Sequence, residues 1–186
     1  MNRKVLFAAL FAVATVFGVS AQKFNTAPTF LKGEKQTNVV FDYSQTKYDG
    51  DSQEKYYKGK DQDWIKDWEG DRRDNNASLF TKSLNDELTN AALQAGSYPD
   101  AQYTIIVSVL ECKFGFFAGP FAKPAKCKCT IQIVKTGTTD ALSSITLEGQ
   151  QNTFTTTGTP VDFDRIALAF SEVGKQLGKQ LSKVLK

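Results

Sequence analysis

Histidine is absent from all 186 residues of the sequence. Its imidazole is the usual general base of the Ser-His-Asp and Cys-His catalytic arrangements and a common ligand in zinc sites. Phosphate-loop, dinucleotide-binding and nucleophile-elbow motifs are also absent when the full spacing of each is required. These absences favour a protein that binds over one that catalyses, and we expect no cofactor and no metal site.

The sequence also lacks a large excess of either charge. It has 23 basic and 20 acidic side chains. Removal of residues 1–21 would take away Arg3 and Lys4 and no acid, so the balance would become nearly even. A near-neutral domain does not attract nucleic acid as a whole, and we expect no nucleic-acid partner.

Long apolar runs are scarce, and the only one lies at the N-terminus. Arg3 and Lys4 precede a mostly apolar segment, 5–19, and the small residue Ala21 follows it before Gln22. This order is typical of a secretory signal peptide and resembles the start of proteins that Gram-negative bacteria export. The run is shorter than the ~20 apolar residues of a membrane-spanning helix. We therefore predict cleavage after Ala21, a periplasmic or extracellular location, and no transmembrane segment in the mature chain.

The remaining pattern predicts a flexible lead-in at 22–36 and a single domain at 37–186. Residues that alternate between apolar and polar, or that form short β-branched runs, predict four strands. These strands are expected at 37–44, within 101–117, at 127–133 and at 141–154. The last three should form an antiparallel meander, because they follow one another closely.

Apolar residues that recur every three or four positions predict two long helices. One is expected to run from Asn76, as its cap, to Ala95. The other is expected to begin at Asp162 or Asp164 and to run nearly to the C-terminus.

The order strand, helix, three strands, helix predicts an α+β fold with two layers. We expect a mainly antiparallel four-stranded sheet with both helices on one face. Gly174 and Gly178 should each cost the last helix about 1 kcal/mol relative to alanine, and we interpret them as allowing close packing on the sheet. The element order is similar to that of several small bacterial envelope proteins that assist outer-membrane assembly or transport, at the level of topology alone.

The connection between the second and third strands, 115–124, is unusually apolar. It contains Phe116, Phe117 and Phe121. Four lysines flank these phenylalanines: Lys113, Lys123, Lys126 and Lys128. A solvated loop does not usually hold three phenylalanines, so these either fold back over the sheet or contact a partner. Our leading hypothesis is a non-enzymatic binding or assembly protein of the cell envelope that contacts a protein or a lipid surface with this tip.

A row of lysines on the last helix offers a second candidate contact. Lys175, Lys179 and Lys183 lie one turn apart on its polar side. A solvated face is the ordinary explanation, and it is favourable near the C-terminal end of a helix dipole. Contact with anionic lipid or an acidic partner is the alternative.

Trp64 and Trp68 have helical spacing within a highly charged segment, so both indoles can lie on one side of a short helix. They either cover one end of the core or form an aromatic platform for a small ligand such as a sugar or a lipid. The second interpretation is our alternative function.

Three cysteines, Cys112, Cys127 and Cys129, lie in the exported part of the chain. A cross-strand disulfide is expected if the second and third strands form a hairpin, with Cys112 opposite Cys129 or nearly so. A redox pair or a zinc site is less favoured, because the spacing differs from the thioredoxin motif and a fourth zinc ligand is lacking.

Carboxylates supply the only enzymatic alternative, a hydrolase that uses Asp63, Asp67 or Glu111. A calcium loop counted from Asp67 fails, because Arg72 stands where glycine is needed and Ser78 stands where a bidentate glutamate is needed. We expect neither role.

Overall fold

The computed structural model describes residues 23–118, 121–152 and 162–186. The predicted signal peptide and its cleavage point lie outside these residues. The segment predicted to be a loose lead-in contacts the domain from its first described residues onward. Asn25 donates its backbone N–H to the oxygen of Ser144 at 2.9 Å, and Leu31 is buried.

The described residues form nine strands and four α-helices. The strands are β1 (Gln36–Asp42), β2 (Lys47–Tyr48), β3 (Asp51–Ser52), β4 (Gln94–Gly96), β5 (Tyr103–Lys113), β6 (Phe116–Ala118), β7 (Phe121–Lys123), β8 (Lys126–Lys135) and β9 (Ala141–Gln150). The α-helices are α1 (Gln53–Tyr57), α2 (Gln62–Asp67), α3 (Arg73–Leu88) and α4 (Asp162–Leu185). Short 3₁₀ turns lie at Thr29–Leu31 and Thr89–Ala91, and a π-helical turn lies at Trp68–Arg72.

Seven of the strands form one mixed sheet. Strand β1 lies between β4 and β5 and is parallel to both, and β2 is also parallel to β5. Strands β5, β8 and β9 form the antiparallel meander that the sequence predicts, and β3 is antiparallel to β2. The α+β class is thus confirmed. The expected mainly antiparallel, four-stranded sheet is wrong, because within the described residues three of the six pairings in this sheet are parallel.

The additional strands come from segments whose sequence pattern is too short to predict a strand. Residues 94–96 belong to β4, whereas the apolar pattern predicts that the helix continues to Ala95. Helix α3 is the crossover that brings the chain back to run parallel to β1. Strand β4 then pairs with one side of β1, and β5 pairs with the other side. The helix ends at Leu88, and Ala92 adopts the left-handed conformation with φ 53°.

The start of α3 also differs from the prediction. Asn76 is not a cap but a buried residue inside the helix, which begins at Arg73. The π-helical turn joins α2 to α3 through a kink at Gly70. Because α3 continues from α2, its first N–H groups do not form a free end that requires a side-chain cap.

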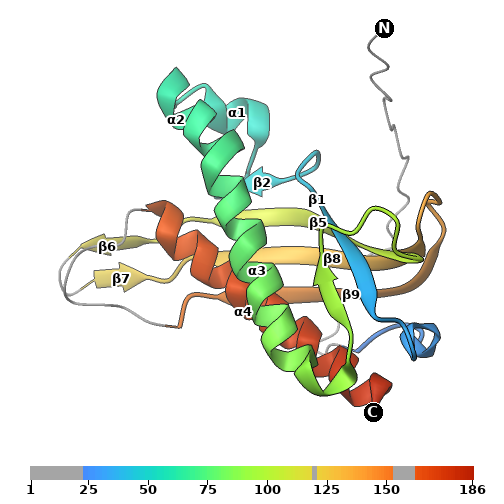
Figure 1. Cartoon of the computed structure of the whole chain (residues 1–186). Coiled ribbons are helices and arrows are strands. Elements are labelled where there is room, and N and C mark those ends of the chain that lie inside the picture. Colours follow the sequence, from blue (N-terminus) through green and yellow to red (C-terminus); the bar gives the residue numbers. More distant parts are fainter. Residues whose placement is uncertain (1–22, 119–120, 153–161) are drawn as a thin grey trace, which may run out of the picture.

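Helices α3 and α4 cross on the same side of the sheet (Figure 1). Helix α4 packs on β8 and β9, and α3 packs on α4 and β4. A methyl group on Gly174 would overlap the backbone oxygen of Phe80, and one on Gly178 would lie 2.8 Å from the backbone oxygen of Leu84. The two glycines therefore allow close packing against α3, not against the sheet as we expected.

Candidate functional site

Strands β6 and β7 form a separate two-stranded hairpin at one end of the molecule (Figure 1). Among the described residues they pair only with each other, with Phe116 opposite Lys123 and Ala118 opposite Phe121. Because side chains alternate along a strand, Phe116, Phe121 and Lys123 share one face of this hairpin.

Two of the three predicted tip residues are open to solvent. Phe121 is 70% exposed and Phe116 is 44% exposed, so neither folds back over the sheet. The side chain of Phe117 lies outside the described part of the structure. The sequence leaves two interpretations of this tip open, and the coordinates decide between them for Phe116 and Phe121.

The base of the hairpin is anchored in the core. Phe114 and Ala125, which flank its two arms, are both buried. The backbone N–H of Ala125 donates to Gln151 Oε1 at 3.2 Å, and that of Gln151 donates to the oxygen of Ala125 at 2.9 Å. Gly115 turns the chain out of β5 with φ 67°, and a methyl group there would overlap the oxygen of Lys123. These contacts fix the direction in which the exposed phenylalanines project.

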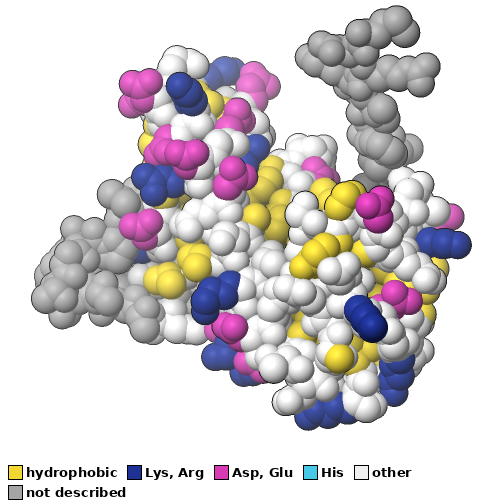
Figure 2. Space-filling model, in the orientation of Figure 1, with side chains coloured by type: hydrophobic (Ala, Val, Ile, Leu, Met, Phe, Trp, Pro, Cys, Tyr) yellow, Lys and Arg dark blue, Asp and Glu magenta, His cyan; other side chains and the backbone are white. Residues whose placement is uncertain are grey.

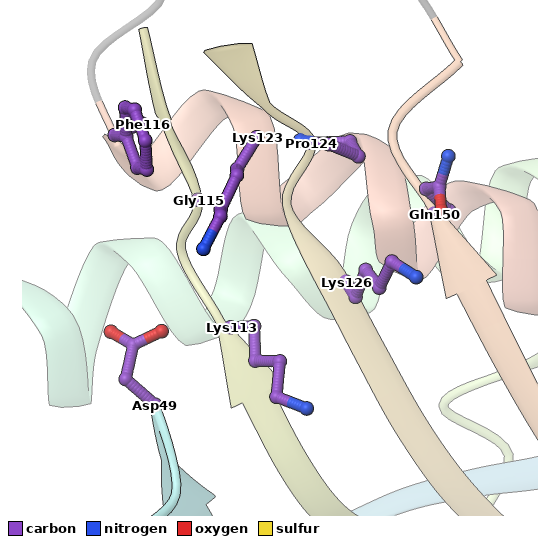
Figure 3. Close-up of a pocket in the computed structure, with 8 residues that line it drawn as sticks. All are labelled: Asp49, Lys113, Gly115, Phe116, Lys123, Pro124, Lys126 and Gln150. Carbon is purple, nitrogen blue, oxygen red and sulfur yellow. The ribbon is translucent and has the colours of Figure 1, made fainter. Parts of the chain in front are cut away.

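A cavity of about 620 Å³ lies at the base of the hairpin (Figure 3). Its lining includes three lysines and one carboxylate. The lining residues are Asp49, Lys113, Gly115, Phe116, Lys123, Pro124, Lys126 and Gln150. Phe116 and Lys123 come from the hairpin, and Lys113 and Lys126 come from the ends of β5 and β8 (Figure 3). The cavity therefore continues the face that carries the exposed phenylalanines.

The charges around this cavity are incompletely balanced. Lys113 and Lys126 lie opposite each other in the β5–β8 register, where like charges repel. Each has a carboxylate nearby: Glu111 is 3.1 Å from Lys113, and Glu148 is 3.9 Å from Lys126. These ion pairs are solvent-exposed and therefore weak.

The other two charged groups have different surroundings. Asp49 accepts hydrogen bonds from the backbone N–H of Phe114 and from the hydroxyl of Tyr56, both at 3.3 Å. The ammonium group of Lys123 lies 5.7 Å from the ring centre of Phe116. The lining therefore carries three ammonium groups and the one carboxylate of Asp49, and two of the three lysines also have a carboxylate neighbour outside the lining.

The predicted lysine row on α4 is present but is accompanied by acids. Lys175, Lys179 and Lys183 are all exposed. Lys175 lines a second cavity together with Asp86, Glu87 and Glu172. Basic and acidic side chains are interspersed over the face that α3 and α4 present in Figure 2. The surface of α4 is therefore less uniformly positive than the spacing of the three lysines alone indicates.

The two tryptophans belong to an aromatic cluster beside the core. Trp68 is fully buried, and its indole N–H donates to the hydroxyl of Tyr48 at 3.3 Å. Trp64 is half-buried and stacks on Trp68 with ring centres 6.1 Å apart, and the ammonium of Lys60 lies 4.9 Å from its ring. This geometry supports a packing role for Trp68 and leaves part of Trp64 at the surface.

The three cysteines are buried and are free thiols. Cys112 lies opposite Cys127, and Cys129 lies opposite Val109, so the expected pairing of Cys112 with Cys129 is corrected. The register of the whole strand pair decides this, because Val109 already lies opposite Cys129 and the bulge between Val109 and Glu111 shifts the pairing by only one residue. Burial raises the pKa of Cys112 and of Cys127 well above the usual range. Both thiols are therefore protonated and weakly nucleophilic at neutral pH.

The carboxylates of the hydrolase alternative lie on two elements. Asp63 and Asp67 belong to α2, and Glu111 belongs to β5. Asp67 pairs with Arg72 at 3.0 Å, and Glu111 pairs with Lys113. Within the described ranges, no group of three or more His, Cys, Asp or Glu side chains could hold a metal ion.

Sequence reasoning missed the cavity at the base of the hairpin. Lys113, Lys123 and Lys126 flank the phenylalanines along the chain, and this proximity was the available signal. Asp49 and Gln150 join them only through the pairing of distant segments, which no local pattern shows.

The fold defines an α+β protein in which two long helices cover one face of a mixed sheet. No family model matches the sequence, and no curated protein matches it. The fold is similar to that of a PelC dodecamer from Paraburkholderia phytofirmans, with 11% sequence identity, a TM-score of 0.47, and coverage of 85% of this chain and 98% of that chain. A variant of that dodecamer has 13% identity, a TM-score of 0.43, and coverage of 87% and 95%.

A minor lipoprotein from Acinetobacter baumannii has 13% identity, a TM-score of 0.36, and coverage of 82% and 93%. None of these three similarities reaches a TM-score of 0.5, and none assigns a function to this chain. Among the helices of the described residues, none has the length and apolar character needed to cross a bilayer.

Proposed function

We propose that this chain is an exported, non-enzymatic binding or assembly protein of the bacterial cell envelope. It contacts its partner through the β6–β7 hairpin. The observation that carries this proposal is the exposure of Phe116 and Phe121 on a hairpin whose base is anchored by buried residues. Exposed aromatic side chains grouped at one place are typical of interaction sites.

Because the base of the hairpin is anchored in the core, the exposure of Phe116 and Phe121 is a property of the folded hairpin and not of a loose segment. An isolated two-stranded hairpin is at best marginally stable in water. Here Phe114 and Ala125 are themselves buried where the two arms begin. Phe116 and Phe121 lie further along the arms and remain outside the core. The signal-peptide pattern supports export, and the absence of histidine supports binding over catalysis.

Co-sedimentation of the mature protein with isolated Gram-negative envelopes tests the proposal. We expect the double variant Phe116→Ser/Phe121→Ser to lose at least tenfold in binding with little change in melting temperature. Leu142→Ser is the matched control, because Leu142 is 42% exposed on a different strand, β9, and should retain binding. Unchanged binding by the double variant would contradict the proposal, and a large fall in melting temperature would show that the phenylalanines belong to the core.

The alternative function is binding of a small sugar or lipid beside Trp64. The partial exposure of this indole, with Lys60 over its ring, supports it. Titration of the protein with a panel of glycans and detergent-solubilised lipids should then quench tryptophan fluorescence, and Trp64→Phe should remove the response. The partner-binding proposal expects no such quenching by a soluble glycan.

A further inference from the structure

We propose that the hairpin docks on a membrane surface that contains anionic phospholipid. Phe116 and Phe121 enter the interfacial region, and Lys113, Lys123 and Lys126 face the phosphate groups. This inference rests on the proposed function, because it names the partner of the same hairpin.

The arrangement of the two kinds of side chain on one surface is the first argument. Phe116, Phe121 and Lys123 share a face of the hairpin by register. That face continues into the cavity that Lys113 and Lys126 line (Figure 3). Aromatic rings that enter the interface beside lysines that stay at headgroup level are the usual chemistry of interfacial membrane binding.

The charge around the cavity is the second argument. Lys113 and Lys126 face each other across two strands, and their carboxylate neighbours are held by weak, exposed ion pairs. The lining itself holds three lysines and one carboxylate, that of Asp49, so it keeps an excess of positive charge. Anionic headgroups placed against this surface would screen the repulsion between the two lysines. Anionic lipid is therefore complementary to the surface, whereas a neutral bilayer is not.

The size and position of the apolar area are the third argument. A whole aromatic side chain has roughly 150–250 Å² of surface, so the exposed parts of two phenylalanines amount to about 200 Å². A stable protein interface buries about 1,000 Å² or more, counted over both partners and over polar as well as apolar surface, so these two rings would be only a small part of one. A lipid surface requires no matching shape, and the hairpin lies at one end of the sheet (Figure 1). A small apolar area bordered by lysines is the combination that favours a lipid surface here.

Vesicle co-sedimentation of the mature protein tests the inference directly. We expect binding to vesicles of equal parts phosphatidylglycerol and phosphatidylcholine, and much weaker binding to vesicles of phosphatidylcholine alone. Binding should fall strongly at about 1 M NaCl, where the screening length is only about 3 Å. Inorganic phosphate at millimolar concentration should compete poorly, because it lacks the apolar region that the phenylalanines need.

Charge variants distinguish this surface from the rest of the protein. Each lysine near an anionic surface contributes about fivefold in affinity, so Lys113→Gln/Lys123→Gln/Lys126→Gln should weaken binding on the order of 100-fold. The matched control is Lys175→Gln/Lys179→Gln/Lys183→Gln, which removes the same charge from α4 and should retain most of the binding. An equal loss in both triple variants would overturn the inference.

The two proposals fail in different ways. If phosphatidylglycerol vesicles do not bind while envelopes still bind through Phe116 and Phe121, the lipid inference is wrong and the proposed function stands. If inorganic phosphate abolishes vesicle binding, the cavity binds a soluble anion and the lipid inference is again wrong. If neither vesicles nor envelopes bind, both proposals are wrong.

Discussion

Gly174 provides the sharpest test of how α3 and α4 pack. In a helix exposed to solvent, glycine-to-alanine replacement stabilises the protein by about 1 kcal/mol. Here a methyl group at position 174 would overlap the backbone oxygen of Phe80 in α3. We therefore predict that Gly174→Ala destabilises the protein, which is the opposite sign to that expected from helix propensity.

The magnitude follows from what must move. A backbone oxygen cannot rotate away as a side chain can, so α3 and α4 must separate where Phe80 and Leu84 pack. Overpacking of this kind typically costs about 1–3 kcal/mol, and separation also loses dispersion contacts along the helices. With a cost of about 3 kcal/mol and a propensity gain of about 1 kcal/mol, the net loss is about 2 kcal/mol. For a chain of this size that corresponds to a fall of about 4–8 °C in melting temperature.

Urea and thermal unfolding followed by circular dichroism would measure this loss. Gly59→Ala is the control, because a methyl group there would lie 3.7 Å from its nearest neighbour, the oxygen of Tyr56. Its free energy of unfolding should change by no more than about 0.5 kcal/mol. If Gly174→Ala is as stable as the parent protein, the close approach of the two helices is wrong.

Three further predictions concern buried polar groups. Burial raises the pKa of Tyr43 and of Tyr57 above the ordinary value near 10, so the unfolded chain releases protons that the folded chain keeps. The free energy of unfolding should therefore be fully maintained below about pH 9 and fall as pH rises through about 10. If urea unfolding gives a free energy of unfolding that stays constant or rises across that range, the prediction is wrong. Burial likewise raises the pKa of Cys112 and of Cys127, so a maleimide should label them far more slowly in the folded chain than in urea, as mass spectrometry would show. Arg73 donates to two tyrosine hydroxyls at 3.2 Å, so Arg73→Leu should lower the free energy of unfolding by about 2 kcal/mol, and a change below about 0.5 kcal/mol would refute that role.

The sequence predicted the elements whose signal is local. Strands β1, β5, β8 and β9 and helix α4 lie where the alternation or the helical period of apolar residues placed them. The sequence also marked the connection at 115–124 as unusually apolar, but it left open whether the phenylalanines fold back or stay exposed, which the coordinates decide for Phe116 and Phe121. A local pattern indicates which side of a strand or helix faces the core. It does so whichever strand or helix packs against that side.

Tertiary structure alone decided which elements meet. Three residues at 94–96 show no strand period, yet they pair in parallel with β1 and extend the sheet on its far side from β5. Gly174 and Gly178 appeared to favour packing on the sheet, whereas the surface they contact is α3. Lys113 and Lys126 form a basic cavity with Asp49 only because β2 and β8 both pair with β5. Such contacts depend on the pairing of segments far apart in the chain, and the energy that selects one pairing is a property of the whole packed domain.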